Sequence, residues 1–427
     1  MKSTVAVVGG GVAGIVAAWE LAKSGWEVTL FEKQGRVGGH TNTIVVPDGP
    51  DAGTAVDTGF IVCNDKTYPN FHRFLAELGV AWRWSDMSFG YHDEETGLQY
   101  AGTDLSGLFA QRANALSPEF LSLVAGIVRF NGPALADLAA GRLAGLTLGR
   151  YLDERRFSVP FVRHYILPIG AAVWSTGLDG MLDFPAETFV RFFKNHGLLS
   201  LTGRARWQTV VGGSHSYLKA FLAKFPGTVR AGAGVEALRR LPSGGVEVRT
   251  AVGEPERFDR AVVAAHADEA LALLADPSAD ETRLLGAWTY SRNRTLLHND
   301  ADLLPPNRRA WASWNYRREA GEDGTGPASL TYDMVRLQGL RTKERWLVTL
   351  NPRREPRPSS VLRELDYRHP RFDFRALASQ ARLPSLNGVR STWFCGSYHG
   401  YGFHEDAVKS ALAVAAGFAV KPSEVRS

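Results

Sequence analysis

Three glycines near the N-terminus have the spacing of a loop that binds the phosphates of a dinucleotide. Gly9, Gly11 and Gly14 satisfy the pattern G-x-G-x-x-G. The first glycine permits a tight turn, the second lets the backbone approach a pyrophosphate, and the third lets the next helix pack on the preceding strand. Val12 and Ala13 lie at the start of that helix, where unpaired N–H groups and the helix dipole favour an anion.

The elements that must position this loop follow the same order along the chain. Thr4–Val8 predicts a strand, Val12–Ser24 a helix that ends at Gly25, and Val28–Phe31 a second strand. Glu32 follows at close to the spacing of about 20 residues expected for a carboxylate that binds a ribose. Strand, loop, helix, strand and acid together predict a dinucleotide-binding βαβ unit. These residues alone leave open which dinucleotide binds.

A pair of glycines further along the chain indicates which dinucleotide binds. Glu32, Arg36, Gly38 and Gly39 form the pattern Glu-x3-Arg-x-Gly-Gly, and with it the sequence resembles the flavin amine oxidase superfamily. The resemblance implies non-covalently bound FAD, with Glu32 at the adenosine ribose and Arg36 near the pyrophosphate. We find no second glycine loop after a strand, so a separate NAD(P)H domain is not expected.

The resemblance also implies the other cofactor contacts. Gly39–Thr41 would approach the ribityl chain, Val56–Phe60 would pass beside the isoalloxazine ring, and the backbone of Val235 would contact adenine. At Ser397 the superfamily generally has an acidic residue that holds ribityl hydroxyls, so that contact is in doubt. The residues expected to bind FAD are Gly9, Gly11, Val12, Ala13, Gly14, Glu32, Lys33, Arg36, Gly38, Gly39, His40, Thr41, Thr58, Gly59, Phe60, Val235, Gly396, Ser397, Phe403 and His404.

His404 is the candidate catalytic residue. It stands at the predicted start of the last helix, where the superfamily places the N1 and C2 carbonyl edge of the flavin. Helix N–H groups or a protonated His404 would stabilise the negative charge of reduced flavin, whereas a carboxylate would oppose it. We therefore expect Glu405 and Asp406 to point away and cap the helix. Simple turn packing is the competing reading of His404.

The expected fold class is α/β: a Rossmann-like FAD-binding domain of the glutathione reductase type, with an inserted mixed α+β substrate domain. The FAD-binding domain is expected to be discontinuous, over 1–64, 205–275 and 386–427, with the substrate domain over 65–204 and 276–385. Further expected elements are a strand at Asp259–Ala265 that closes the adenine side of the FAD-binding domain, helices at Tyr68–Leu78, Pro118–Phe130 and Ala407–Gly417, and strands at Ser329–Met334 and Trp346–Leu350.

Several blocks narrow the resemblance further, among them Ala172–Ser175, Trp311–Tyr316 and Gly402–Asp406. They are similar to amine-oxidase-like flavoproteins encoded beside cyclopropane-fatty-acid-synthase-type methyltransferases, or fused to them in plants. This resemblance implies an FAD-dependent oxidoreductase that dehydrogenates or oxidises a methyl-branched or cyclopropane fatty acyl chain by hydride transfer to flavin N5. Two alternatives stay open: an oxidase of an amine or another small apolar substrate, and a non-catalytic flavin-binding partner of a lipid methyltransferase.

Composition sets the remaining limits. The chain has 427 residues, a formal net charge of +5 and two cysteines, too few for a disulfide scaffold. The basic balance suits an anionic partner such as a phospholipid surface, although a solvated basic surface is the plainer interpretation. No nucleic-acid motif accompanies it, so we expect no nucleic acid and at most transient membrane contact. No metal-ligand spacing is evident, and we expect His196 and His298 to be hydrogen-bonded structural residues. The start of the chain runs directly into the glycine loop, so we expect no secretory signal and a cytoplasmic protein, peripheral at the inner face of the membrane at most.

Overall fold

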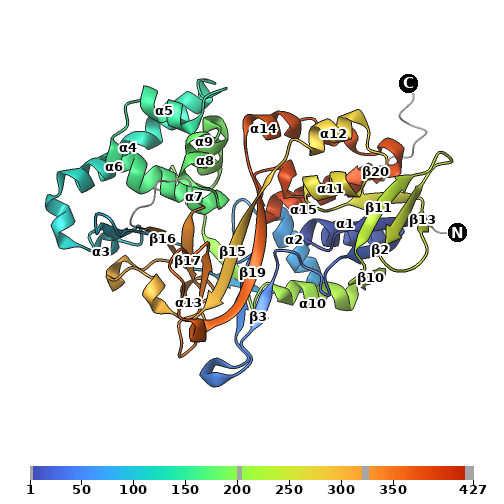
Figure 1. The fold of residues 1–427 in the computed structure, drawn as a ribbon, viewed down its shortest axis with the longest axis horizontal. Helices are drawn as coiled ribbons and strands as arrows, with labels where there is room; N and C mark the ends of the chain where they lie inside the picture. The colour runs from blue at the N-terminus through green and yellow to red at the C-terminus, as the bar shows by residue number, and fades with distance from the viewer. Residues whose placement is uncertain (1–2, 200–203, 320–326, 419–427) are drawn as a thin grey trace.

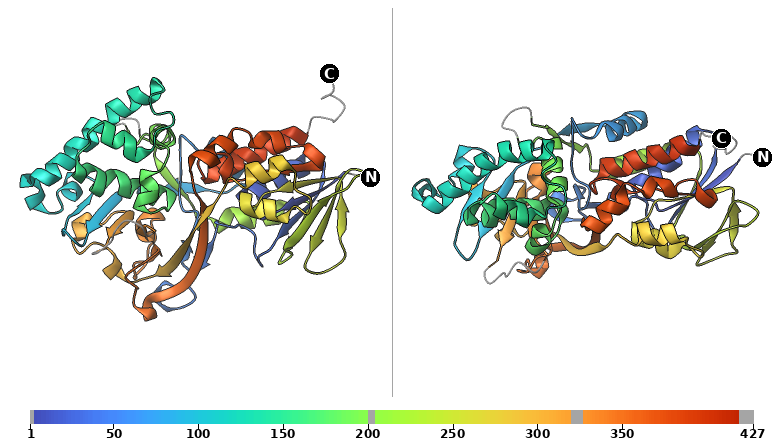
Figure 2. Two further views of the ribbon diagram at one scale, coloured as in Figure 1. Left: turned by 45° about the horizontal axis from the view of Figure 1, so that its top comes forward. Right: turned by 90° about the horizontal axis from the view of Figure 1, so that it is seen from above.

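A computed structural model describes residues 3–199, 204–319 and 327–418. A parallel sheet with its helices lies at one end of the molecule, a larger sheet crosses the middle, and a group of helices lies at the other end (Figures 1 and 2). Four stretches of the predicted domains, 1–2, 200–203, 320–326 and 419–427, lie outside the described residues.

The parallel sheet has five strands drawn from distant parts of the chain. In spatial order these are β10 (Thr228–Ala231), β2 (Glu27–Glu32), β1 (Thr4–Val8), β14 (Arg260–Val263) and β20 (Thr392–Phe394). The strands predicted at Thr4–Val8 and Val28–Phe31 are confirmed. The strand expected at Asp259–Ala265 is confirmed as the shorter β14, but it lies inside the sheet, between β1 and β20, instead of closing the adenine side. Asp259 instead bonds to Thr4 through its side chain and its amide.

Both faces of this sheet are covered, since alternate residues of β1 pack into two different cores. Val5 and Val7 pack with helices, and Ala6 and Val8 pack toward a small antiparallel sheet. The helices are α1 (Val12–Lys23), α2 (Pro69–Leu78), α10 (His215–Lys224) and α15 (His404–Phe418). The opposite face has β11 (Val235–Arg240), β12 (Val246–Thr250), β13 (Glu256–Phe258), α11 (Ala267–Leu273) and α12 (Ala279–Leu285). The helices predicted at Tyr68–Leu78 and Ala407–Gly417 are confirmed as α2 and α15, with slightly different ends.

The central sheet has seven strands. Their order is β19 (Val361–Pro370), β15 (Tyr290–His298), β18 (Leu347–Leu350), β17 (Ser329–Asp333), β16 (Trp314–Arg318), β7 (Phe89–Asp93) and β8 (Gln99–Ala101). Among the described residues of this sheet, β16 and β7 form the single parallel pair. The predicted strands at Ser329–Met334 and Trp346–Leu350 are confirmed as β17 and β18. Smaller ladders join β3 (Thr43–Val45) to β4 (Ala55–Asp57), and β5 (Cys63–Asn64), β9 (Trp207–Val210) and β6 (Trp82–Trp84).

Helices fill the space beside the central sheet. They are α3 (Leu105–Leu108), α4 (Pro118–Ala139), α5 (Leu148–Glu154), α6 (Val159–Phe161), α7 (Leu167–Trp174), α8 (Leu178–Leu182), α9 (Ala186–Asn195), α13 (Met334–Leu337) and α14 (Phe374–Gln380). Short 3₁₀ turns occupy Gly49–Asp51, Arg112–Leu116 (η2), Ala301–Leu303, Arg308–Ala310 (η5), Pro358–Ser360, Leu383–Leu386, Val389–Ser391 and Ser397–His399, and a π turn occupies Val162–Ile166.

The helix predicted at Pro118–Phe130 is longer than expected, because α4 passes through Pro133 and ends at Ala139. Pro133 removes one backbone donor, but Phe130, Ala134 and Asp137 continue the buried side of the helix. Packing of that side outweighs the loss of a single hydrogen bond.

Candidate cofactor and active site

The predicted glycine loop lies at the carboxyl ends of the parallel strands, the edge at which open α/β sheets bind ligands. The Gly9 N–H donates to the Phe31 carbonyl over 2.8 Å, which joins the loop to the end of β2. The Gly38 N–H donates to the Gly10 carbonyl over 2.7 Å, so the second glycine pair lies directly on the first loop.

The three loop glycines differ in what a side chain would meet. A Cβ at Gly14 would lie 1.8 Å from the Gly9 carbonyl oxygen, and one at Gly9 would lie 2.6 Å from the Ala264 oxygen. A Cβ at Gly11 would meet nothing within 4 Å. Close packing therefore demands glycine at positions 9 and 14, whereas Gly11 borders open space at the start of α1. This is the space in which the loop is expected to hold a pyrophosphate.

Glu32 is buried at the end of β2 and faces the same loop. Its carboxylate accepts the Gly10 N–H over 2.7 Å and the Gln34 N–H over 2.8 Å. Each oxygen keeps a second lone pair, so the group can still accept ribose hydroxyls. The Ala233 N–H donates to the Glu32 backbone carbonyl, and Val235 begins β11 two residues later. The exposed side chain of Lys33 instead forms a 2.7 Å ion pair with Glu269.

Arg36 shapes the second glycine segment. Its guanidinium donates to the carbonyls of Gly39 and Thr41, over 3.1 Å in each case. The arginine thus fixes the turn, and its contact with phosphate stays a prediction.

The two segments expected to lie along the ribityl chain and the isoalloxazine ring, Gly39–Thr41 and Val56–Phe60, form one unit because backbone hydrogen bonds join them. The Phe60 N–H donates to the His40 carbonyl over 2.8 Å, and the Thr58 N–H donates to the Asn42 carbonyl over 2.9 Å. A Cβ at Gly59 would lie 2.2 Å from the His40 oxygen, so this contact requires glycine.

His404 joins this unit at the first residue of α15. Its ring stacks on Phe60 with centroids 3.7 Å apart, and its Nε2 lies 3.1 Å from the Tyr217 hydroxyl. That hydroxyl lies 2.5 Å from the Thr41 hydroxyl, which completes a polar chain of three side chains. Burial lowers the pKa of His404 to about 3. A protonated His404 is therefore not supported, because charging the ring would cost its solvation; it acts as a neutral imidazole.

The two carboxylates after His404 both accept backbone N–H groups at helix starts, and one of them caps the last helix as expected. Asp406 accepts the N–H groups of Tyr401 and Phe403, both over 3.0 Å, and so caps its own helix. Glu405 differs from the expectation, because it accepts the N–H groups of Asn70 and Phe71 and caps α2 instead. Burial raises the pKa of Asp406 to about 6.

Gly396, Ser397 and Phe403 border the site from β20. The Cys395 N–H donates to the Val263 carbonyl over 3.2 Å, which places Gly396 beside the end of β14. The Ser397 carbonyl accepts the N–H groups of Gly400 and Gly402, and this turn leads to Phe403.

Several residues around the site had not been predicted. The Tyr367 hydroxyl contacts Thr58 and Asn42, and its ring stacks on His40. His266 and His399, which had not been predicted either, each have a buried ring nitrogen with no hydrogen-bond partner in the described part of the chain, as does the predicted His40. His266 and His399 follow the ends of β14 and β20, and this position is the sequence signal that could have marked them.

These groups form a cradle that fits a flavin dinucleotide. It offers helix N–H groups and open space at Gly11, a buried carboxylate at Glu32, and unpaired imidazole nitrogens beyond the second glycine pair. The described residues hold no group of three or more His, Cys, Asp or Glu side chains suited to a metal ion.

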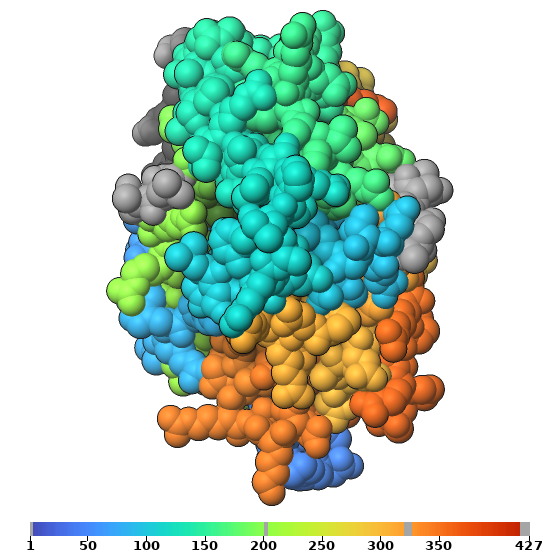
Figure 3. Space-filling view, turned by 90° about the vertical axis from the view of Figure 1, so that its left-hand side faces the viewer, coloured from blue at the N-terminus to red at the C-terminus, as the bar shows by residue number. Residues whose placement is uncertain are grey.

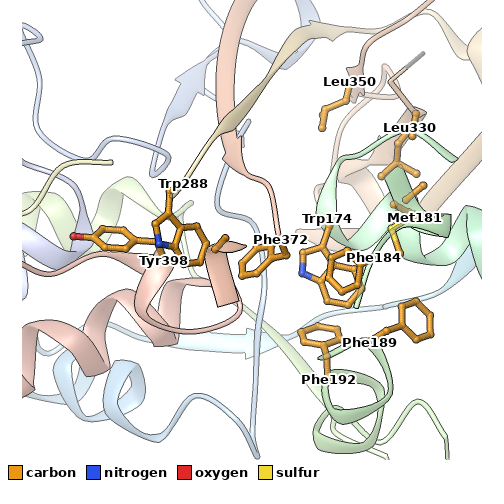
Figure 4. Close-up of a cluster of buried hydrophobic side chains, with 14 of the residues drawn as sticks. Trp174, Met181, Phe184, Phe189, Phe192, Trp288, Leu330, Leu350, Phe372 and Tyr398 are labelled. Atoms are coloured by element: carbon orange, nitrogen blue, oxygen red, sulfur yellow. The ribbon is translucent and has the colours of Figure 1, made fainter. Parts of the chain in front are cut away.

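An aromatic layer connects this cradle to the helices beside the central sheet. We give this name to Phe403, Phe192, Trp174, Phe184 and Phe372, most of which appear in Figure 4. The ring centroids of successive members lie 4.9, 4.8, 4.5 and 6.1 Å apart. All but Phe403 are buried. The layer is thus a buried apolar cluster without an ionisable member, and it reaches the cradle at Phe403, the residue before His404.

Comparisons with known proteins agree with this geometry. Residues 12–293 match the sequence model of the flavin containing amine oxidoreductase family. A 39-residue stretch is 60% identical to thiamine thiazole synthase of Desulfosudis oleivorans, but the chain covers only 15% of that protein.

Solved structures match over almost the whole chain. A fatty acid isomerase from P. acnes that produces CLA has a TM-score of 0.70 at 13% identity, covering 98% of this chain and 99% of that one. Putrescine oxidase bound to putrescine has a TM-score of 0.71 at 16% identity, with 99% and 100% covered. Cyclohexylamine oxidase from Brevibacterium oxydans has a TM-score of 0.66 at 15% identity, with 98% and 100% covered. At these identities the likeness shows a shared fold.

Proposed function

The chain belongs to the flavin-containing amine oxidoreductase family and is an FAD-dependent oxidoreductase, and we propose that its substrate is a fatty acyl chain. The finer proposal is dehydrogenation or oxidation of a methyl-branched or cyclopropane chain. It is supported by the resemblance to flavoproteins encoded beside cyclopropane-fatty-acid-synthase-type methyltransferases. A methyltransferase of that kind would then be a partner.

The aromatic layer is the observation that carries the proposal. An acyl chain has no charge to neutralise, and its transfer from water to an apolar surface is favourable. The two carboxylates that follow Phe403 and His404 in the chain, Glu405 and Asp406, already accept backbone N–H groups. An aliphatic chain suits such a surface better than a diamine, which needs acceptors for its ammonium groups. One neighbour of the same fold acts on a fatty acid, which adds support.

Each part of the site has a role in this reaction. FAD, when bound, supplies the acceptor for the hydride. The glycine loop and Glu32 hold the dinucleotide, and the aromatic layer binds the chain and excludes water. The neutral His404 and the Tyr217 and Thr41 hydroxyls can hold or pass on a proton at the edge of the cradle.

Phospholipids that carry methyl-branched or cyclopropane chains are expected to bleach the oxidised flavin band of the purified protein without oxygen. The aromatic layer favours such chains, and their dehydrogenation must reduce the flavin. Spectroscopy follows the bleaching, and mass spectrometry should find the chains two hydrogens lighter.

The matched substrates are phospholipids with straight saturated chains, putrescine and NADPH. Rapid reduction by putrescine with no change in any lipid would favour the alternative of an amine oxidase. Reduction by NADPH alone would indicate a reductase. If none of these compounds reduced the flavin, a non-catalytic partner of a lipid methyltransferase would be the better description.

A His404→Gln variant is expected to keep FAD but to shift its reduction potential by about 30 mV, the equivalent of about 1.4 kcal/mol for a two-electron couple. Glutamine keeps a polar group near Tyr217 but loses the imidazole that stacks on Phe60. Because the pKa of His404 is about 3, the wild-type potential should show no inflection from this residue between pH 5 and pH 8.

Potentiometric titration at several pH values measures both effects. Tyr217→Phe is the matched control, since it removes the hydroxyl next to His404 and leaves the ring in place. An unchanged potential in both variants would assign His404 to turn packing.

A further inference from the structure

The outer side of α4 is apolar where the exposed side of a surface helix is normally charged. Leu121, Ala125, Val128, Gly132 and Ala136 repeat at helical spacing and are all exposed. By length and composition α4 could cross a membrane. However, Phe120, Leu123, Phe130 and other residues on its inner side are buried in the fold, so only the outer side is available.

Another surface helix of the same chain shows the ordinary pattern. In α9, Arg191, Lys194 and Asn195 are exposed, and Glu187 pairs with Arg191. The exposed charged residues of α4 are Glu119 in its first turn and Arg129, and Arg129 donates to the carbonyls of Arg155 and Arg156 rather than to a carboxylate. The apolar outer side of α4 therefore differs from the charged outer side of α9.

Further exposed aliphatic side chains extend this apolar side. Leu105 in α3 is 76% exposed, Leu116 at the end of η2 is 87% exposed, and Val128 is 67% exposed. The Ser158 hydroxyl bonds to the Ser122 carbonyl, which brings Val159, 70% exposed, beside α4. Single exposed leucines are common, but several exposed aliphatic side chains on the successive elements α3, η2, α4 and α6 favour an interaction surface.

Basic side chains border the same surface. Arg112 lies in η2, and a cavity of about 440 Å³ next to Leu105 is lined by Arg308 and Arg309 of η5 together with α3 residues. Figure 3 shows the two segments in contact, with residues near 100–140 in blue-green above residues near 300–310 in amber. The same cavity contains Asp86 and Asp104, and Asp86 pairs with Arg336.

We propose that this surface, formed by Leu105, Leu116, Leu121, Val128 and Val159 with Arg112, Arg129, Arg308 and Arg309, docks on a bilayer that contains anionic phospholipids. We call it the α4 face. The aliphatic side chains would enter the interfacial region, with α4 in the plane of the membrane, while the arginines meet phosphate groups.

A bilayer fits this surface better than a second protein does. Protein interfaces are enriched in aromatic residues and methionine, whereas the apolar members here are leucine and valine. The face also lies at the outer end of the molecule, where α3, α4 and α6 project away from the sheets (Figures 1 and 2). A lipid substrate would add a reason for such docking, and this reason alone rests on the proposed function.

Flotation of the FAD-loaded protein with vesicles tests the proposal. The wild type is expected to bind vesicles of phosphatidylcholine mixed with phosphatidylglycerol more tightly than phosphatidylcholine alone, and less tightly as salt rises. The affinity of the double variant Leu116→Asp, Val128→Asp for these vesicles should be lower by at least about tenfold, because two aliphatic contacts are replaced by charges. Both side chains are exposed, so the fold should survive, as circular dichroism can verify.

Val252→Asp is the matched control. Val252 is 87% exposed, as Leu116 is, but lies between β12 and β13 near the parallel sheet, away from α4. Its binding should equal that of the wild type. Full binding by the double variant, equal loss in the control, or equal binding to phosphatidylcholine alone would each overturn the proposal.

A second outcome would assign the surface to a protein. If the wild type ignored vesicles but formed a dimer that the double variant breaks, the α4 face would be an interface between copies and the proposal would fail. The assay measures binding without turnover, so it is separate from the proposed function. If the protein floats with vesicles but oxidises no lipid, the docking proposal for the α4 face stands and the proposal of an acyl substrate is wrong.

Discussion

A Gly11→Val variant is expected to fold but to bind FAD at least about 100-fold more weakly, because valine would occupy the space expected for the pyrophosphate. The structure leaves this position open, since a Cβ there meets nothing within 4 Å. The backbone is also compatible with valine, with φ −71° and ψ 176°. Flavin content, measured after release in denaturant and chromatography, should fall to near zero while the thermal transition of the apoprotein is kept.

Gly14→Val is the informative counterpart. Its Cβ would lie 1.8 Å from the Gly9 carbonyl oxygen, so the helix must move away from the strand, at a cost of about 3 kcal/mol or more. The Gly14→Val variant should lose FAD because the protein unfolds. The Gly11→Val variant should lose FAD while the protein stays folded. A Gly11→Val protein that retained full FAD, or a wild type that released FMN or NADP, would contradict the assignment of the loop.

The parts of the fold that could be predicted from the sequence are those fixed by local spacing. Gly9, Gly11, Gly14 and Glu32 fall within one βαβ unit, so the sequence alone predicts their order along the chain and their role. The structure then brings Gly38–Thr41 and Thr58–Phe60 together with His404, as the resemblance implied. Direct contact of these residues with FAD stays a prediction.

Long-range contacts could not be predicted in the same way. Strand β7 pairs in parallel with β16 from 225 residues further along, as in the pair Trp314 and Phe89, and five residues of β pattern do not indicate such a partner. Tyr217 and Tyr367 reach Thr41 and Thr58 from distant elements and have no motif spacing. Glu405 caps α2 rather than its own helix, and α4 continues through Pro133. Both features depend on tertiary packing, which at Pro133 overrides the local preference against helix.

The protein is expected to lose about 5 kcal/mol of unfolding free energy between pH 7.5 and pH 5, because several histidines are buried in the neutral form. Burial lowers the pKa of His298, His369 and His399 to about 4, and that of His404 to about 3. Each folded-state pKa lies below the unfolded value of about 6.5, so the unfolded chain binds more protons. The stability from each histidine is thus complete above pH 6.5 and is lost as the pH falls from there toward 4.

Two carboxyls act in the opposite direction over part of this range. Burial raises the pKa of Asp57 and of Asp406 to about 6, so each binds more protons in the folded state between about pH 4 and pH 6. Four histidines against two carboxyls still leave a net uptake of about two protons on unfolding, a slope near 3 kcal/mol per pH unit below pH 6. Urea unfolding followed by tryptophan fluorescence at several pH values measures this slope.

His298 offers a matched variant because it lies in β15 of the central sheet, where the role of a structural histidine is clear. Its Nδ1 accepts the Asp300 N–H over 3.1 Å, so its Nε2 must donate to the Thr349 hydroxyl 2.8 Å away, and a second ring proton would face a donor. His298→Asn retains an acceptor near the Nδ1 position but cannot titrate. The variant should be less stable at pH 7.5, yet its stability should fall less steeply with acid, by about 1.4 kcal/mol per pH unit. An unchanged slope would show that His298 does not stay neutral in the folded protein.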